Sequence, residues 1–232
     1  MKKLYALMIL LSMTLTPSFA FAEKLNLDGE YINLRTQKID GKNYISLTDL
    51  EYGLQDTDAE FRLSSDNSKK IYITPGEQSD GYLEINDIYT KKNKMNTTTF
   101  VYLGVNENYE EYEKIELETT EQDGETLVNL REIMNILGYG IVYDKNNKTL
   151  SLKHSDLNIT LYGAHWCPYC EKAENYLKGQ GIAYRYVNTD TDYGKEKFAK
   201  YDEGYIPVLV INDEVIRDTS NENINKVLQS YR

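Results

Sequence analysis

Cysteine is scarce in this chain, and its distribution excludes several kinds of protein. The 232 residues include two cysteines, Cys167 and Cys170, which both lie in the last third of the sequence. Because no cysteine precedes Cys167, a lipid-modified cysteine near the N-terminus is excluded as a membrane anchor. Residues 23–154 contain no cysteine and one histidine, His154, so this part offers too few ligands for a soft-metal site.

Positive charge is also in short supply. The chain has 26 lysine and arginine residues against 37 aspartate and glutamate residues, which gives a net charge of −11. A chain of this charge repels phosphate backbones and anionic lipids, which argues against nucleic acid as a partner. The hydrophobic content of 41% and the charged content of 27% are ordinary for a soluble globular protein, so we expect a buried core.

Long apolar runs are absent from the sequence except at its beginning. Lys2 and Lys3 precede an apolar run from Leu4 to Leu15, and small residues follow up to Ala22. This pattern is typical of a bacterial export signal, and we expect cleavage near Ala22. Since a bilayer span needs ~20 apolar residues, the mature chain should have no transmembrane segment and be secreted or extracytoplasmic. An uncleaved anchor is the alternative.

Residues 23–154 consist of short alternating segments separated by Asp-Gly and Asn-rich turns, a pattern typical of β-hairpins. The segment repeats itself at an offset of 83 positions, which aligns Asp40-Gly41 with Asp123-Gly124 and Tyr44-Ile45 with Leu127-Val128. Each copy is expected to contain a strand, a turn, a strand, a short helix and a hairpin. The prediction is therefore an α+β domain of two repeated strand-rich units, with an irregular insertion over residues 75–98.

Three motifs in the second copy suggest a family for this part. They are Asn129-Leu130-Arg131-Glu132-Ile133, Leu137-Gly138-Tyr139 and the run of residues 143–150. With them, residues 23–154 resemble the copper amine oxidase N-terminal-like domain of exported bacterial proteins. The resemblance implies an accessory module without chemistry of its own, and it does not imply copper. We interpret the many tyrosines as strand residues that fill a small core, with a binding face as the alternative.

The pattern changes after a short polar link, and residues 155–232 are expected to form a separate α/β domain. Strands are predicted at residues 158–162, 182–187, 207–211 and 214–216, and helices at residues 167–178, 193–201 and 221–231. The alternation of strands and helices makes the first two strands parallel. The Asn212-Asp213 turn makes the last two strands an antiparallel hairpin.

The motif Cys167-Pro168-Tyr169-Cys170 falls between a predicted strand and a predicted helix, a context in which this cysteine spacing indicates redox chemistry. A helix N-terminus lowers the pKa of a thiol because unpaired N–H groups and the helix dipole stabilise the thiolate. We therefore expect Cys167, at the exposed end, to be the nucleophile and Cys170 to resolve the mixed disulfide. A structural disulfide would close too short a loop to stabilise much. A zinc site would need more ligands than the two cysteines and His165 supply.

Together with Tyr205-Ile206-Pro207-Val208, the cysteine motif makes residues 158–232 resemble the glutaredoxins. The resemblance implies a thioredoxin-like fold, a cis bond before Pro207, and a thiol-disulfide oxidoreductase that acts on proteins or low-molecular-weight thiols. No metal or resident cofactor is implied, and glutathione or another thiol is the candidate co-substrate. The candidate substrate-binding residues are Trp166, Tyr169, Tyr205, Ile206, Arg217 and Asp218.

The sequence departs from the glutaredoxins in two places. Members of the family tend to carry a basic residue three positions before the nucleophile and a Gly-Gly pair after the last strand. Here Ala164 and Arg217-Asp218 occupy those positions, which argues against glutathione binding but leaves the dithiol chemistry intact. The rival hypothesis is a cell-surface binding protein whose thioredoxin-fold domain is catalytically idle.

Overall fold

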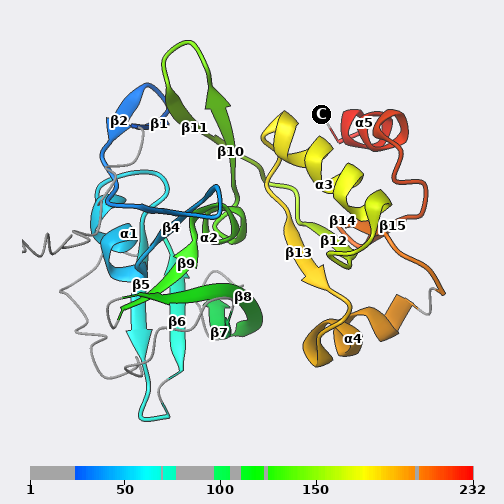
Figure 1. The fold of residues 1–232 in the computed structure, drawn as a ribbon, viewed down its shortest axis with the longest axis horizontal. Coiled ribbons are helices and arrows are strands. Elements are labelled where there is room, and N and C mark those ends of the chain that lie inside the picture. Colours follow the sequence, from blue (N-terminus) through cyan, green and yellow to red (C-terminus); the bar gives the residue numbers. More distant parts are fainter. Residues whose placement is uncertain are drawn as a thin grey trace, which may run out of the picture.

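The computed structural model describes residues 24–68, 70–76, 97–104, 111–122, 125–201 and 204–231. The expected export signal at residues 1–22 and most of the expected insertion over residues 75–98 lie outside these ranges. No helix in the described ranges is long and apolar enough to cross a membrane. Residues 24–154 are termed the N-terminal region and residues 155–231 the C-terminal region, and Figure 1 shows the two side by side.

The N-terminal region is built mainly from two β-sheets. The first contains β3 (Gln37–Ile39), β4 (Lys42–Ile45), β5 (Phe61–Ser65), β6 (Ile71–Pro75), β7 (Thr97–Gly104), β8 (Tyr112–Gln122) and β9 (Glu125–Asn129). The second contains β1 (Leu25–Leu27), β2 (Glu30–Ile32), β10 (Tyr139–Asp144) and β11 (Thr149–His154). The strand orders are β3-β4-β9-β8-β7-β6-β5 and β10-β11-β1-β2. Neighbouring strands are antiparallel except in the β6–β7 and β1–β11 pairs.

Two short helices, α1 (Leu47–Gly53) and α2 (Leu130–Ile136), join the hairpins of this region. Each is preceded by a polar residue, Ser46 or Asn129, whose side chain accepts hydrogen bonds from backbone N–H groups of the first turn. The apolar faces of both helices pack with both sheets in one continuous core.

The order hairpin, helix, hairpin occurs at residues 37–75 and again at residues 112–154. The two stretches are used differently, because β5 and β6 join the seven-stranded sheet whereas β10 and β11 join the four-stranded one. The sequence repeat itself therefore stays a prediction, as does the resemblance of this region to the copper amine oxidase N-terminal-like domain.

The C-terminal region has the predicted order of strands and helices. Its elements are β12 (Ile159–Gly163), α3 (Pro168–Gln180), β13 (Arg185–Asn188), α4 (Asp192–Phe198), the 3₁₀ helix η2 (Ala199–Tyr201), β14 (Val208–Ile211), β15 (Glu214–Ile216) and α5 (Asn221–Gln229). In the sheet, with the order β13-β12-β14-β15, β12 and β13 are parallel and β14 and β15 form an antiparallel hairpin. This is the arrangement of a thioredoxin-like fold.

The predicted bounds of one strand were wrong, for a local reason. Residues 182–184 were expected to begin the second strand, but β13 starts at Arg185. Gly181 ends α3 in the left-handed conformation, with φ of 66°. The N–H groups of Gly181 and Ile182 bond back to Lys178 and Leu177, so these residues belong to the turn that terminates the helix.

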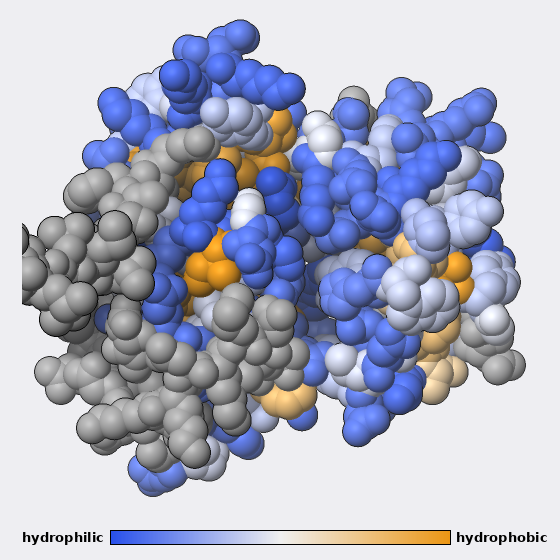
Figure 2. All heavy atoms as spheres, viewed as in Figure 1, coloured by the Kyte–Doolittle hydropathy of each residue, from blue (hydrophilic) through white to orange (hydrophobic). Residues whose placement is uncertain are grey.

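Helices cover both faces of the small sheet. Leu161 and Leu209 pack with residues of α3 and α5 on one face. Tyr162 and Val208 pack with Phe198 of α4 and Tyr201 of η2 on the other. The outer face of α3 is hydrophilic, as Figure 2 shows. This packing fixes the N-terminal end of α3, where the cysteine motif lies, at one end of β12.

Polar contacts join the two regions through β8. Arg185 at the start of β13 forms an ion pair with Glu113, and Lys197 of α4 lies 3.8 Å from the same carboxylate. The Thr191 hydroxyl donates to Glu116 at 2.9 Å, and the Tyr193 hydroxyl donates to the backbone carbonyl of Lys114 at 2.8 Å. The N-terminal region therefore holds the β13 and α4 side of the C-terminal region.

A second contact between the regions depends on glycine. Gly140 of β10 packs so closely on the turn after α3 that an added Cβ would overlap the carbonyl group of Gly181. A Cβ on Gly181 would in turn overlap the side chain of Val142. The close approach of these backbones brings β10 against the C-terminal end of the helix that carries the cysteines.

Candidate redox site

The two cysteines form a disulfide at the start of α3, with their Cα atoms 5.2 Å apart. Cys167 is the N-cap residue of the helix, and its sulfur accepts a hydrogen bond from the backbone N–H of Cys170 at 3.2 Å. Pro168 occupies the first turn, where a missing N–H costs nothing. The geometry thus directs a free backbone donor of the helix at the sulfur of Cys167.

The expectation that Cys167 is exposed was wrong for this disulfide state. Its exposed fraction is 4%, and that of Cys170 is 1%. Both cysteines form a small cluster with Ala164, against which Ile206 packs. The exposed side chains of the motif are those of its neighbours, since Trp166 is 70% and Tyr169 is 74% exposed.

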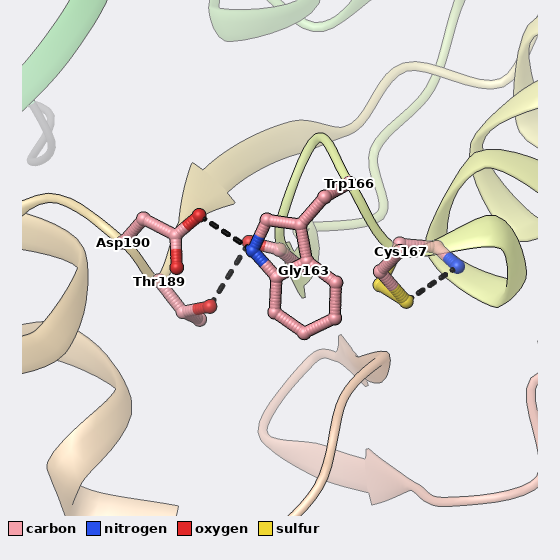
Figure 3. Close-up of a disulfide and its surroundings, with 6 residues drawn as sticks. Gly163, Trp166, Cys167, Thr189 and Asp190 are labelled. Atoms are coloured by element: carbon pink, nitrogen blue, oxygen red, sulfur yellow. Dashed lines mark hydrogen bonds between the residues drawn. A yellow bond between two sulfur atoms is a disulfide. The ribbon is translucent and has the colours of Figure 1, made fainter.

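Trp166 is turned away from the cysteine beside it. Its indole N–H donates to the carboxylate of Asp190 at 2.9 Å, as Figure 3 shows. Asp190 follows β13, and the adjacent Thr189 bonds to the carbonyl of Gly163 through both its N–H and its hydroxyl. The loop after β13 therefore fixes the tryptophan at the rim of the site. Sequence reasoning missed Asp190, since no motif links this residue to the cysteines.

The segment before β14 lies on another side of the disulfide. The Ile206–Pro207 peptide bond is cis, and Ile206 packs against the cysteine cluster. Tyr205 is half-exposed. Of the predicted substrate-binding residues, Ile206 therefore contacts the cysteine cluster, and Tyr205 is the residue before it in the chain.

Arg217 and Asp218 are placed in the loop between β15 and α5, where both are exposed. Asp218 accepts a hydrogen bond from the N–H of Ser220, which lowers the pKa of its carboxyl, and its carbonyl accepts from the Asn223 side chain. The Asp218 contacts organise the start of α5. The role of this pair in substrate binding stays a prediction.

His165 and Tyr186 form a stacked pair next to the motif, with ring centroids 5.4 Å apart. His165 is exposed, and the Tyr186 ring on which it stacks belongs to β13. Sequence reasoning gave Tyr186 no role, because a tyrosine in a predicted strand looks like any core residue. The one available signal was Gly163, a residue without a side chain that lies four positions before Cys167.

A cavity of about 450 Å³ lies between the two regions and extends to His165. Lys42, Glu118 and Glu132 line it from the N-terminal region, and Glu174 lines it from α3. Burial raises the pKa of Glu132 to about 7, and the nearby Glu118 and Glu174 carboxylates act in the same direction. The cavity therefore contains a carboxyl group that titrates near neutral pH.

Within the described ranges, no group of three or more histidine, cysteine, aspartate or glutamate side chains is placed to hold a metal ion.

Comparison with known proteins places the C-terminal region in context. Two solved structures that resemble the chain are the thioredoxin-like protein BC3987 and a point mutant of it, each 25% identical. The alignments cover 30% and 31% of this chain and 97% and 99% of those chains, with TM-scores of 0.28 and 0.29. No curated protein matches the chain.

Residues 159–216 match the glutaredoxin family model. This match spans both cysteines and the cis bond before Pro207, and it supports a glutaredoxin domain at the C-terminal end of the chain.

Proposed function

We propose that the protein is an exported thiol-disulfide oxidoreductase that exchanges disulfides with proteins or low-molecular-weight thiols through Cys167 and Cys170. One observation carries the proposal: a disulfide lies at the N-terminal end of α3, inside the segment that matches the glutaredoxin family. Export is supported by the charged, apolar and small-residue pattern of residues 1–22.

The hydrogen bond at Cys167 supports its role as the nucleophile. When the disulfide is reduced, the N–H of Cys170 and the helix N-terminus stabilise a thiolate at Cys167. That thiolate attacks a substrate disulfide, a mixed disulfide forms, and the second substrate sulfur leaves as a thiolate. Cys170 then attacks the sulfur of Cys167, which releases the substrate as a dithiol and reforms the internal disulfide. The reverse sequence oxidises a substrate dithiol.

Substrates reach the sulfurs over a surface with exposed aromatic side chains. Trp166 and Tyr169 adjoin the cysteines in the sequence and are exposed, and Ile206, which follows the half-exposed Tyr205, packs against the buried cysteine cluster. Such a surface suits an extended polypeptide with a cysteine. The N-terminal region holds the β13 and α4 side of the domain through β8 and the C-terminal end of α3 through β10.

The test is thiol-dependent reduction of a model protein disulfide by the purified mature chain. Wild-type protein should be active, and Cys167→Ala should abolish the activity because no nucleophile remains. A redox titration that follows the fluorescence of Trp166, the one tryptophan in the chain, would give the reduction potential. A potential between about −270 and −120 mV fits an oxidoreductase.

The controls separate loss of chemistry from loss of fold. Far-ultraviolet circular dichroism and the thermal midpoint of Cys167→Ala should match those of reduced wild-type protein. Folded wild-type protein without activity, with a pair that stays oxidised below roughly −300 mV, would mark a structural disulfide and favour the binding-protein hypothesis.

A further inference from the structure

The sulfur of Cys170 needs a hydrogen-bond donor once the disulfide opens. Cys170 is 1% exposed, and its cluster partners are the apolar Ala164 and Ile206. A thiolate in apolar surroundings is poorly solvated, which raises its pKa and makes it slow to form. The backbone donor at the helix N-terminus does not solve this problem, because it is directed at Cys167.

Gly163 opens a small space beside that sulfur. It is the last residue of β12, and a Cβ built on it would lie 3.1 Å from the Cys170 sulfur. The same Cβ would lie 3.0 Å from the hydroxyl oxygen of Tyr186. The hydroxyl and the sulfur therefore border one space that any larger residue at position 163 would occupy.

The hydroxyl of Tyr186 is free to donate. Within the described ranges it has no hydrogen-bond partner, whereas two other tyrosine hydroxyls of this region do. Tyr184 donates to Glu174 at 2.9 Å, and Tyr193 donates to the carbonyl of Lys114 at 2.8 Å. Burial also raises the pKa of Tyr186, so its hydroxyl stays protonated at neutral pH.

We infer that Tyr186 is a positioning residue whose hydroxyl donates a hydrogen bond to the Cys170 thiolate when the disulfide is open. The inference rests on the proposed function. When a substrate thiolate attacks the sulfur of Cys167, the bond between Cys167 and Cys170 breaks and its electron pair passes to the Cys170 sulfur. Breaking the bond frees rotation of the Cys170 side chain toward the space at Gly163. By microscopic reversibility, the same hydrogen bond favours the Cys170 thiolate that resolves the mixed disulfide.

The chain is suited to a direct test because it has two cysteines. Reduced full-length protein labelled at cysteine with ¹³Cβ gives two resonances, which the Cys167→Ser variant assigns. A pH titration of the Cys170 resonance yields its pKa without any activity measurement. Tyr186→Phe removes the hydroxyl and keeps the ring that stacks on His165. Because the hydrogen bond is lost, the pKa of Cys170 should rise by about one pH unit.

Tyr184→Phe is the matched control. It removes a hydroxyl two residues away whose partner, Glu174, keeps its ion pair with Lys178 at 2.7 Å. This variant should leave the pKa of Cys170 unchanged. Equal pKa values in wild-type protein and Tyr186→Phe, or an equal rise in both variants, would overturn the inference.

The titration also separates the two levels of the proposal. A raised pKa in Tyr186→Phe supports the hydrogen bond even if wild-type protein reduces no disulfide, in which case the proposed function fails by itself. If wild-type protein is active but its Cys170 has the same pKa as in Tyr186→Phe, the proposed function is supported and the hydrogen bond from Tyr186 is overturned.

Discussion

The two regions of the molecule divide stability and chemistry between them. The N-terminal region packs two sheets and two helices around one large core and contains no cysteine. The C-terminal region has a smaller core on each face of a four-stranded sheet, and the cysteines form a third cluster with Ala164 at the end of that sheet. The difference teaches that the reactive sulfurs are placed by the local packing of β12, α3 and the segment before β14. The core of the N-terminal region does not include the residues that pack against the cysteines.

The first way to break this comparison is to damage the large core. Ile133 of α2 is fully buried there, and Ile133→Ala should lower the free energy of unfolding by about 2–5 kcal/mol because it leaves a cavity. Urea unfolding measures the loss. The reduction potential of the cysteine pair should stay within about 30 mV of the wild-type value.

A larger change in potential would mean that the N-terminal core shapes the redox site, and the division between the regions would fail. Ile224→Ala is the matched control, because Ile224 is equally buried in the core of the C-terminal region. It should destabilise that region instead.

The second prediction concerns Glu132 and the cavity between the regions. Its folded-state pKa of about 7 lies above the ordinary 4.5, so the folded protein holds this proton more tightly than the unfolded chain. The corresponding stability is fully present below pH 4.5 and is lost as pH rises to about 7, a loss of roughly 3 kcal/mol. Glu132→Gln should remove this pH dependence and make the protein more stable than wild type at pH 8.

Urea unfolding of both proteins at several pH values between 4 and 8 checks this prediction. Glu30→Gln, which neutralises an exposed carboxylate on β2, is the control and should follow the wild-type profile. Parallel profiles for wild-type protein and Glu132→Gln would show that Glu132 is ionised in the folded protein throughout this range.

The prediction with the smallest expected effect concerns the interaction energy of an ion pair between the two regions. Arg185 and Glu113 form an ion pair across the interface, and both side chains are partly exposed. A double-mutant cycle with Arg185→Gln and Glu113→Gln should give a coupling energy of about 1 kcal/mol. A coupling of zero would mean that this contact orients the regions without stabilising their association.

The sequence predicted the C-terminal region well because its signals are local. Alternating apolar segments placed the strands and helices, and the Cys-Pro-Tyr-Cys and Ile206-Pro207 motifs placed the site. The start of β13 was missed because the turn at Gly181 looks like an apolar strand when only residue types are read. The burial of Cys167 was missed because it depends on Ile206, which is distant in sequence.

The contacts between the two regions could not be predicted from the sequence either, because they also join residues that are distant in the chain. Lys114 and Glu116 read as the solvent-facing residues of an alternating strand, since they alternate with the buried Ile115 and Leu117. Only the structure shows that a second region covers the outward face at this point. An alternating pattern reports which face of a strand is apolar, but not what lies against its polar face.

The parallel pair of β1 and β11 sets the order in which this chain can complete its fold. Leu25 pairs with Ile32 of β2 on one side and with Leu150 of β11 on the other, so one edge of the first strand has no partner until nearly all of the N-terminal region has been made. A chain made from its N-terminus would present the β1–β2 hairpin early and with an open edge, which is prone to wrong pairing. The neighbouring β10 packs against the C-terminal end of α3, at the opposite end of this helix from the cysteines, so this contact between the regions forms only once both elements have been made.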